Sequence, residues 1–456
     1  MEKAKTILTD GTHSYTEKRD YVPVDNPEVR KHLEWFRGLK LGFMVHWSPV
    51  TQLGINTSWP LSDGDRLWSQ RDIDWVENIE EFKQQYWTLN ETFNPIRFRP
   101  DRWARLAKDC GFQYLLFTTK HHDGFCMFDT KTTDYRITHP SCPFSRHKYA
   151  NITKELFNAF RAEGLAISAY FSKADWHSDA YWHRAFGPAP TRNPNYNISE
   201  HPMLWEEFVQ YTHQQFRELT SEYGKIDTLW LDGGWVRPDN GGQDLRLAEI
   251  IGEIRSTTQP HLIVCDRTVG GPYENIVTPE QRVPEEALDI PWESNLTVGN
   301  SFSFRYDDVC KSTREIVHTF IDIVSKGGNL ALNITPQPDG ELPRTMVHRL
   351  RQLGNWLSPN CEAIYGSSIS PCKPIRKRNL RYTRQENADY CFYLYEDTPY
   401  MAPYIIAHVP FAVKGIRLLR TGQTIPFVQD GEQVTMDTSE VSMVGAEYAD
   451  CFALLR

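Results

Sequence analysis

The sequence predicts an α/β protein, a TIM-like (β/α) barrel followed by a C-terminal antiparallel β-sandwich. From about residue 38 to 360, short apolar runs alternate with amphipathic helical stretches, which is typical of a parallel sheet. The chain has 456 residues, a length that favours a closed barrel plus one smaller domain. After about residue 365 the apolar segments become short and are separated by turn residues, which indicates a sandwich. No GxGxxG opens a helix after the first strand, so a dinucleotide fold is not favoured.

The barrel strands are predicted where short β-prone runs are mostly apolar, as strands buried on both faces should be. These runs are Leu39–Trp47, Tyr114–Thr119, Leu165–Phe171, Thr228–Leu231, Leu262–Val264 and Asn329–Ile334, and a further strand is expected before Trp292. The helices expected between them are Arg102–Cys110, Ile152–Glu163, residues 203–223, Leu245–Ser256 and Ser312–Ser325. Glycines follow several of these stretches at the position where helices commonly end.

Two domains are expected. The barrel domain is predicted to span residues 1–362, with residues 1–35 as an N-terminal arm that contains a helix from about Pro27. The sandwich domain is predicted to span residues 363–456. Its expected strands are Tyr390–Tyr395, Tyr404–His408, Gly415–Leu419 and Glu432–Met436.

Composition and charge exclude several function classes. The net charge is −9 and no basic run occurs, so neither nucleic acid nor a polyanionic substrate is an expected partner. No apolar leader or transmembrane run appears, so no membrane partner is expected, and the protein is predicted to be cytoplasmic, or exported with its signal peptide absent from this chain. Nine scattered cysteines suggest neither a disulfide framework nor a zinc site. The 14 tryptophans suit a cleft that binds sugar rings.

Polar side chains follow the predicted strands, at the end of a barrel where active sites are built. The strand ends carry His46-Trp47, Lys120-His121-His122-Asp123, Tyr170 with Asp175-Trp176-His177, Asp232-Gly233-Gly234-Trp235 and Asp266-Arg267. Five such ends at one barrel mouth are difficult to explain as core residues, so they predict an active site.

Asp232 is the strongest candidate for a catalytic residue in this set. It follows a buried apolar strand and precedes two glycines, which let the backbone turn tightly and leave the carboxylate accessible. A carboxylate placed there suits nucleophilic attack on an anomeric carbon. The alternative interpretation is that Asp232 has a structural role and caps a turn.

The pair His121-His122 raises the question of a metal. Adjacent residues on a strand point to opposite faces, which makes joint ligation of one ion awkward. No third ligand with helical spacing completes a set. Hydrogen bonding to sugar hydroxyls is therefore the preferred interpretation, and neither a metal nor another cofactor is expected.

Long segments resemble glycoside hydrolase family 29, the α-L-fucosidases. The segments that carry the resemblance are LKLGFMVHWSPV, WARLAKDCGFQYLLFTTKHHDGFCMFDT, YFSKADWH, LWLDGGW, TPEQRVP, PWES and SKGGNLALNITPQPDG. Together they cover about residues 35–360. The family architecture is a TIM-like barrel followed by a β-sandwich, which agrees with the pattern of strands and helices.

The resemblance implies roles for the matching positions. Asp232 would be the nucleophile of a retaining exo-α-L-fucosidase that releases terminal fucose from oligosaccharides or glycoconjugates through a covalent fucosyl-enzyme. The residues expected to bind the sugar are His46, Trp59, His121, His122, Tyr170, Trp230, Arg267 and Phe304. The segment CDRT departs from the family's NDRW, with Thr268 in place of the tryptophan. Where many members show WGY, this chain has Phe302-Ser303-Phe304, and an apolar contact with the fucose methyl group is expected from Phe302, Phe304 or Trp59.

Two glutamates are candidates for the general acid/base. Glu280 lies in the expected loop segment TPEQ, from which it can approach the leaving oxygen. Glu293 lies in PWES and is expected to end a strand, where it would be rigid and would orient the nucleophile or a histidine. Glu280 is preferred. In a retaining enzyme the acid/base and Asp232 are expected about 5–5.5 Å apart.

Three alternatives stay open. A glycosidase of this fold could prefer an α-L-galactoside, which differs from a fucoside by one hydroxyl at C6. A catalytically silent carbohydrate-binding protein is disfavoured by the retention of Asp232 and both glutamates. A metal-dependent hydrolase would lose activity to a chelator. The sequence does not specify the natural linkage, the aglycone or the oligomeric state.

Overall fold

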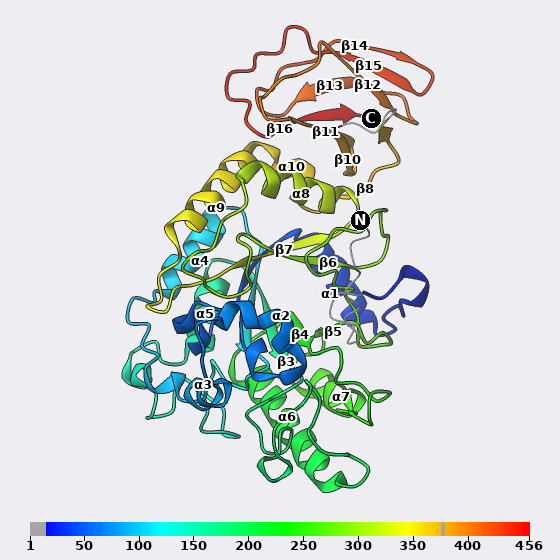
Figure 1. Ribbon diagram of the computed structural model, residues 1–456. Coiled ribbons are helices and arrows are strands. Elements are labelled where there is room, and N and C mark those ends of the chain that lie inside the picture. Colours follow the sequence, from blue (N-terminus) through cyan, green and yellow to red (C-terminus); the bar gives the residue numbers. More distant parts are fainter. Residues whose placement is uncertain (1–14, 375–378) are drawn as a thin grey trace, which may run out of the picture.

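A parallel seven-stranded sheet forms the centre of the computed structural model, which describes residues 15–374 and 379–456. The sheet has the order β5-β4-β3-β2-β1-β7-β6 and curls into a TIM-like half-barrel (Figure 1). Its strands are β1 (Leu41–Val45), β2 (Tyr114–Lys120), β3 (Ala166–Ser172), β4 (Thr228–Asp232), β5 (Ile263–Asp266), β6 (Glu293–Thr297) and β7 (Asn329–Ile334). The predicted fold class is confirmed, and six of the expected strands coincide with observed ones.

The seventh expected strand was placed wrongly. It was predicted to precede Trp292, but β6 begins immediately after that residue. Pro291 has no N–H to donate to a ladder, and Trp292 makes only an isolated bridge with Val277. Further isolated bridges join Cys265 to Glu274 and Glu280 to Asn295. The segment from residue 274 to 280 therefore runs irregularly between β5 and β6, the two edges of the sheet.

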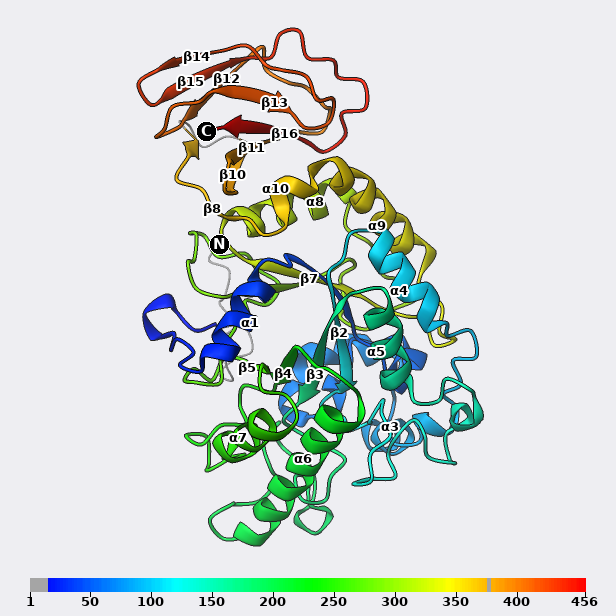
Figure 2. The ribbon, with the colours of Figure 1, turned by 180° about the vertical axis from the view of Figure 1, so that it is seen from behind.

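Helices cover the outside of the curled sheet (Figure 2). They are α4 (Pro100–Asp109), α5 (Ile152–Ala162), α6 (Pro202–Glu222), α7 (Leu247–Thr257), α8 (Thr313–Ser325) and α9 (Arg344–Leu357). Shorter helices in the connections are α2 (Arg66–Ser69), α3 (Ile79–Tyr86) and α10 (Cys361–Ile364). Single 3-10 turns are η1 (Lys18–Asp20), η2 (Pro49–Leu53), η3 (Trp59–Leu61), η4 (Asp63–Asp65), η5 (Gln70–Ile73), η6 (Leu89–Glu91), η7 (Pro143–Arg146), η8 (Arg184–Phe186) and η9 (Ser358–Asn360). The five predicted barrel helices are confirmed to within about two residues at each end.

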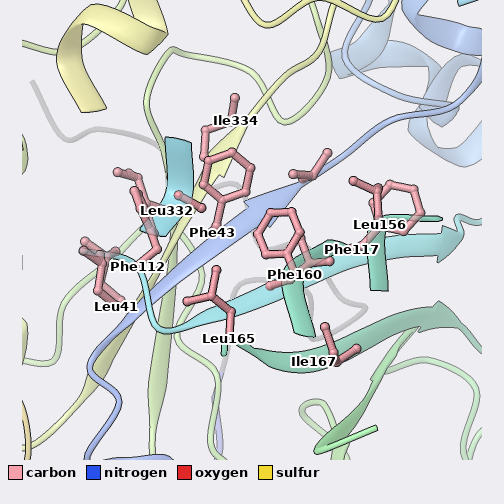
Figure 3. Packing of buried hydrophobic residues seen from close by; sticks show 14 of the residues in the cluster. Leu41, Phe43, Phe112, Phe117, Leu156, Phe160, Leu165, Ile167, Leu332 and Ile334 are labelled. Carbon is pink, nitrogen blue, oxygen red and sulfur yellow. The ribbon is translucent and has the colours of Figure 1, made fainter. Parts of the chain in front are cut away.

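The two faces of each strand have different roles, because successive side chains on a strand point to opposite faces. Outward side chains such as Phe43, Phe117 and Ile167 pack with Leu156 and Phe160 of α5 in the main core (Figure 3). The inward residues include large polar and aromatic side chains, namely Tyr114, Tyr170, Trp230, Asp232, Glu293 and Asn333. The interior of the barrel therefore contains the polar side chains that a site at the carboxyl ends of the strands requires.

Helix α1 (Pro27–Arg37) closes the other end of the barrel. Its Asn26 cap accepts hydrogen bonds from the N–H groups of Glu28 and Val29. Its buried side chains Val29, Leu33 and Phe36 pack against inward residues of the strands, and the Phe36 and Tyr114 rings lie 4.8 Å apart. The helix expected from Pro27 is confirmed, while residues 1–14 of the expected arm lie outside the described residues.

The C-terminal part forms two antiparallel sheets, in the orders β13-β16-β11-β10-β8 and β14-β15-β12-β9. Their strands are β8 (Ser368–Ile369), β9 (Lys373–Pro374), β10 (Leu380–Arg384), β11 (Ala388–Leu394), β12 (Tyr404–His408), β13 (Gly415–Leu418), β14 (Phe427–Asp430), β15 (Gln433–Asp437) and β16 (Ala449–Leu455). This sandwich packs over α8 and α10 (Figure 1). Trp356 Nε1 donates to the Ala449 carbonyl at 2.9 Å, and one continuous apolar core spans the junction. The exact boundary at residue 362 stays a prediction.

Within residues 15–374 and 379–456, no helix combines the length and apolar character that crossing a membrane requires.

Candidate active site

Asp232 is the last residue of β4, at the carboxyl end of the sheet. Its neighbour Gly233 has φ +87°, a left-handed conformation that favours glycine, and donates its N–H to Asp232 Oδ1 at 2.7 Å. A Cβ on Gly234 would lie 2.0 Å from the Thr268 hydroxyl. The two glycines thus permit the turn, as the sequence indicated. Because Gly234 has no side chain, it also leaves room for the segment that contains Arg267.

Three groups hold the Asp232 carboxylate. Arg267 Nη1 donates to Oδ1 at 2.8 Å, the Tyr170 hydroxyl donates to Oδ2 at 2.5 Å, and His122 Nε2 lies 3.7 Å from Oδ2. Burial alone would raise the pKa of Asp232, but Arg267, His122 and Tyr170 outweigh it and hold that pKa well below its usual range. Asp232 is therefore a buried carboxylate that stays ionised.

Three neutral histidines surround this carboxylate. His46 Nδ1 lies 2.8 Å from Asn333 Oδ1, His122 Nδ1 lies 2.6 Å from Ser172 Oγ, and His121 Nδ1 lies 3.4 Å from Ser58 Oγ. Burial lowers the pKa of His46 and of His122 to about 4 and lowers that of His121 as well. Neutral imidazoles offer both a donor and an acceptor, which is what hydroxyl recognition requires.

The sequence argument about His121 and His122 was wrong in one respect. Strand β2 ends at Lys120, so the two histidines are not on a strand and need not point to opposite faces. Their ring centroids lie 4.2 Å apart. Both histidines reach the same site.

Aromatic rings also pack around the Asp232 carboxylate and the three histidines. Tyr170 stacks on Trp230 with centroids 5.2 Å apart, and Trp59 lies 5.0 Å from the His122 ring. Phe302 lies 5.1 Å from the His46 ring, whereas the ring contact found for Phe304 is with Tyr306. Of the two phenylalanines, Phe302 is the one in contact with a predicted sugar-binding residue.

Arg192 is a site residue that sequence reasoning missed. Its guanidinium lies over the Trp59 ring at 4.3 Å, and its Nε donates to Asp65 Oδ2 at 2.7 Å. Asp65 is 127 residues away in the chain, and Arg192 lies in a connection without periodicity, so the sequence carries no signal for this pairing.

Glu280 belongs to the same site. Arg267 Nη2 forms an ion pair with Glu280 Oε2 while its Nη1 holds Asp232. The bridge between Glu280 and Asn295 attaches this residue to β6. One guanidinium therefore contacts both the predicted nucleophile and the preferred acid/base.

Glu293 lies deeper in the barrel. It begins β6 rather than ending a strand, and its carboxylate accepts hydrogen bonds from the Tyr114 hydroxyl at 2.6 Å and from Trp230 Nε1 at 3.1 Å. Burial raises the pKa of Glu293 to about 7. Trp230 in turn stacks on Tyr170, so Glu293 connects to Asp232 through two aromatic side chains. This location suits a supporting role.

The family model described as Alpha-L-fucosidase matches residues 9–362, which is most of the chain. The chain belongs to the alpha-L-fucosidase family. The tissue alpha-L-fucosidase of Bos taurus is 29% identical over 409 residues, covering 85% of this chain and 80% of that protein. The alpha-L-fucosidase of Dictyostelium discoideum is 24% identical, covering 76% of this chain and 73% of that protein.

Solved structures of fucosidases share the fold. Alpha-L-fucosidase isoenzyme 1 from Paenibacillus thiaminolyticus has a TM-score of 0.75 and 25% identity, covering 94% of this chain and 100% of that chain. The Thermotoga maritima alpha-fucosidase has a TM-score of 0.73 and 26% identity, covering 95% and 100%.

Several polar strand-end residues of this fucosidase-family chain do not line the site. Asp175 accepts hydrogen bonds from Lys120 Nζ at 3.1 Å and from the Tyr211 hydroxyl at 2.9 Å. Asp123 accepts one from the Tyr86 hydroxyl at 2.7 Å, and His177 stacks on Tyr135. Buried ionic groups need such partners, so these residues stabilise the loops that contain the site residues.

His121, His122 and Asp232 each offer one ligand atom within 4.8 Å of the others. However, Asp232 already accepts hydrogen bonds from Arg267, Tyr170 and Gly233. A cation would have to compete with the Arg267 guanidinium for the same carboxylate. The expectation of no metal stays a prediction.

Proposed function

We propose that this protein is a retaining exo-α-L-fucosidase in which Asp232 attacks the anomeric carbon of a terminal α-L-fucoside. The observation that carries the proposal is the ionised Asp232 carboxylate, held by Arg267 and Tyr170 at the carboxyl end of β4 and surrounded by three neutral histidines. Membership of the alpha-L-fucosidase family indicates that the sugar is fucose. The Thermotoga maritima alpha-fucosidase is solved in complex with a mechanism based inhibitor, a class of compound that reacts through the catalytic groups themselves.

Asp232 is suited to nucleophilic attack because two of its contacts fix its orientation. Tyr170 and Arg267 bind one carboxylate oxygen each. As the covalent fucosyl-enzyme forms, Asp232 loses its negative charge. The hydrogen bonds that hold the carboxylate then also stabilise it as the leaving group of the second step.

Glu280 is the proposed acid/base. It first gives a proton to the departing glycosidic oxygen and then removes one from the water that hydrolyses the intermediate. Once Asp232 is esterified, Arg267 still pairs with Glu280. That partner is then stabilised as the carboxylate that general-base catalysis requires.

The three histidines are proposed to recognise the fucose hydroxyls. His46, His121 and His122 are uncharged near neutral pH because burial lowers their pKa values. Their positions are fixed by Asn333, Ser58 and Ser172. We expect Phe302, which packs against His46, to contact the fucose methyl group.

Release of nitrophenol from an aryl α-L-fucoside tests the function. We expect hydrolysis that is much faster than hydrolysis of the matching α-L-galactoside and that a chelator leaves unchanged. A faster galactoside reaction would support the related glycosidase, loss of activity with chelator would support a metal-dependent hydrolase, and no turnover of either substrate would support a silent sugar-binding protein.

A further inference from the structure

Two histidines and an aspartate gather at the opposite end of the barrel from Asp232. His32 comes from α1, Asp227 immediately precedes β4, and His261 lies shortly before β5. His32 Nε2 lies 2.9 Å from Asp227 Oδ1, and the rings of His32 and His261 are 4.7 Å apart. One ligand atom from each of the three residues lies within 4.8 Å of the other two.

The outer contacts of this cluster resemble those that orient metal ligands. Asp227 Oδ2 accepts the Ile167 N–H at 2.8 Å, which fixes the carboxylate. The Nε2 atom of His261 is buried without a hydrogen-bond partner among the described residues. A histidine nitrogen in this situation can offer its lone pair to a metal ion.

An ammonium group already pairs with the carboxylate of this cluster. Lys225 Nζ lies 2.7 Å from Asp227 Oδ1, so a metal ion has to displace it. The Lys225 side chain is 51% exposed and is free to turn into solvent.

We propose that His32, Asp227 and His261 bind a divalent transition metal ion of the zinc class, with water completing the coordination. Two imidazoles and one carboxylate are a ligand set that Zn²⁺ accepts. Ligand atoms of a tetrahedral zinc site lie about 3.3 Å apart, so the most widely separated pair in the cluster has to close by up to about 1.5 Å. Lys225 leaves Asp227 when the ion binds.

The ion would act on stability and not on catalysis. Asp227 and Asp232 bracket β4 and are five residues apart, which is about 16 Å along a strand. The ion therefore touches no substrate. It joins α1 to the segments that precede β4 and β5 and so holds the helix that closes the barrel.

Titration of Zn²⁺ into the full chain without a histidine tag tests the proposal, with calorimetry, the melting temperature and the visible absorption of bound Co²⁺ as readouts. We expect one ion per wild-type chain, a higher melting temperature and unchanged hydrolysis of an aryl fucoside. His261→Ala should weaken binding about tenfold or more and abolish the thermal shift. Lys225→Met should tighten binding several-fold, because it removes the competing ammonium.

Lys225 makes this test decisive even if a histidine variant folds poorly, because its side chain is exposed and is not a proposed ligand. Weaker binding in Lys225→Met would overturn the proposal. Wild-type affinity in His261→Ala, or inhibition of hydrolysis by the bound ion, would overturn it as well, because either result places the ion elsewhere. Absence of binding to the wild-type chain would do the same.

Discussion

Arg267 donates a hydrogen bond from Nη1 to Oδ1 of Asp232 at 2.8 Å. Its other terminal nitrogen pairs with Glu280, and the Arg267 side chain is only 3% exposed. The proposed nucleophile and the proposed acid/base therefore share one buried cation. Arg267 fixes their relative position and lowers the pKa of Asp232.

Arg267→Met should raise the pKa of Asp232, because the burial that opposes ionisation remains while its main counterweight is lost. Activity requires ionised Asp232, so the acid limb of kcat/KM should move to higher pH. Arg267→Lys is the matched control, since it keeps the charge but cannot contact both carboxylates at once. An acid limb that stays in place in Arg267→Met would show that another group sets the charge of Asp232.

Asp232→Gly should reduce hydrolysis about 10³-fold or more, because no covalent intermediate can form. Added azide should restore turnover of an activated fucoside and yield β-fucosyl azide, since azide attacks from the side that Asp232 vacates. NMR of the product identifies the anomer. Formation of the α-azide by this variant would mean that a different carboxylate is the nucleophile.

Glu280→Ala should lose far more activity on a natural disaccharide than on an activated aryl fucoside, because a good leaving group departs without protonation. Azide should accelerate the second step and give α-fucosyl azide through the intact Asp232 ester. Glu293→Ala provides the comparison and should lose activity on both substrates without azide rescue. Rescue of Glu293→Ala and not of Glu280→Ala would reverse the assignment.

Glu293 should make stability depend on pH. Burial raises its pKa from 4.5 to about 7 in the folded protein, so the folded state binds its proton more tightly than the unfolded state does. This contribution is complete below pH 4.5 and is lost as pH rises to about 7, a fall of about 3 kcal/mol in the free energy of unfolding. Glu293→Gln should flatten this fall in denaturant titrations at several pH values. An identical pH dependence in the two proteins would contradict the buried, protonated state.

The sequence predicted six of the barrel strands, and the position of Asp232 at the end of one of them, because both depend on local patterns. Buried strands such as Tyr114–Lys120 begin as apolar runs, and the polar residues that follow such a run lie at the carboxyl end of the sheet. The strand that begins at Glu293 was misplaced because Ile290, Pro291 and Trp292 are apolar but form no ladder.

Other features depend on contacts between distant segments. The contact of Arg192 with Trp59 arises from two irregular connections, and its partner Asp65 has no feature that distinguishes it in the sequence. Glu280 lies at the mouth of the barrel and Glu293 lies in its interior. This difference likewise depends on how residues 274–280 fill the space between β5 and β6. Local periodicity carries no information about such packing.

Trapping the covalent intermediate tests the central claim most directly. A 2-deoxy-2-fluoro-fucosyl fluoride slows both steps but keeps a good leaving group, so the fucosyl-enzyme should accumulate. Mass spectrometry should show one added sugar per chain, and peptide mapping should place it on Asp232, with no label on Asp232→Asn. A label on Glu280 or another residue, or rapid turnover that releases the inverted sugar without any labelled protein, would contradict the account.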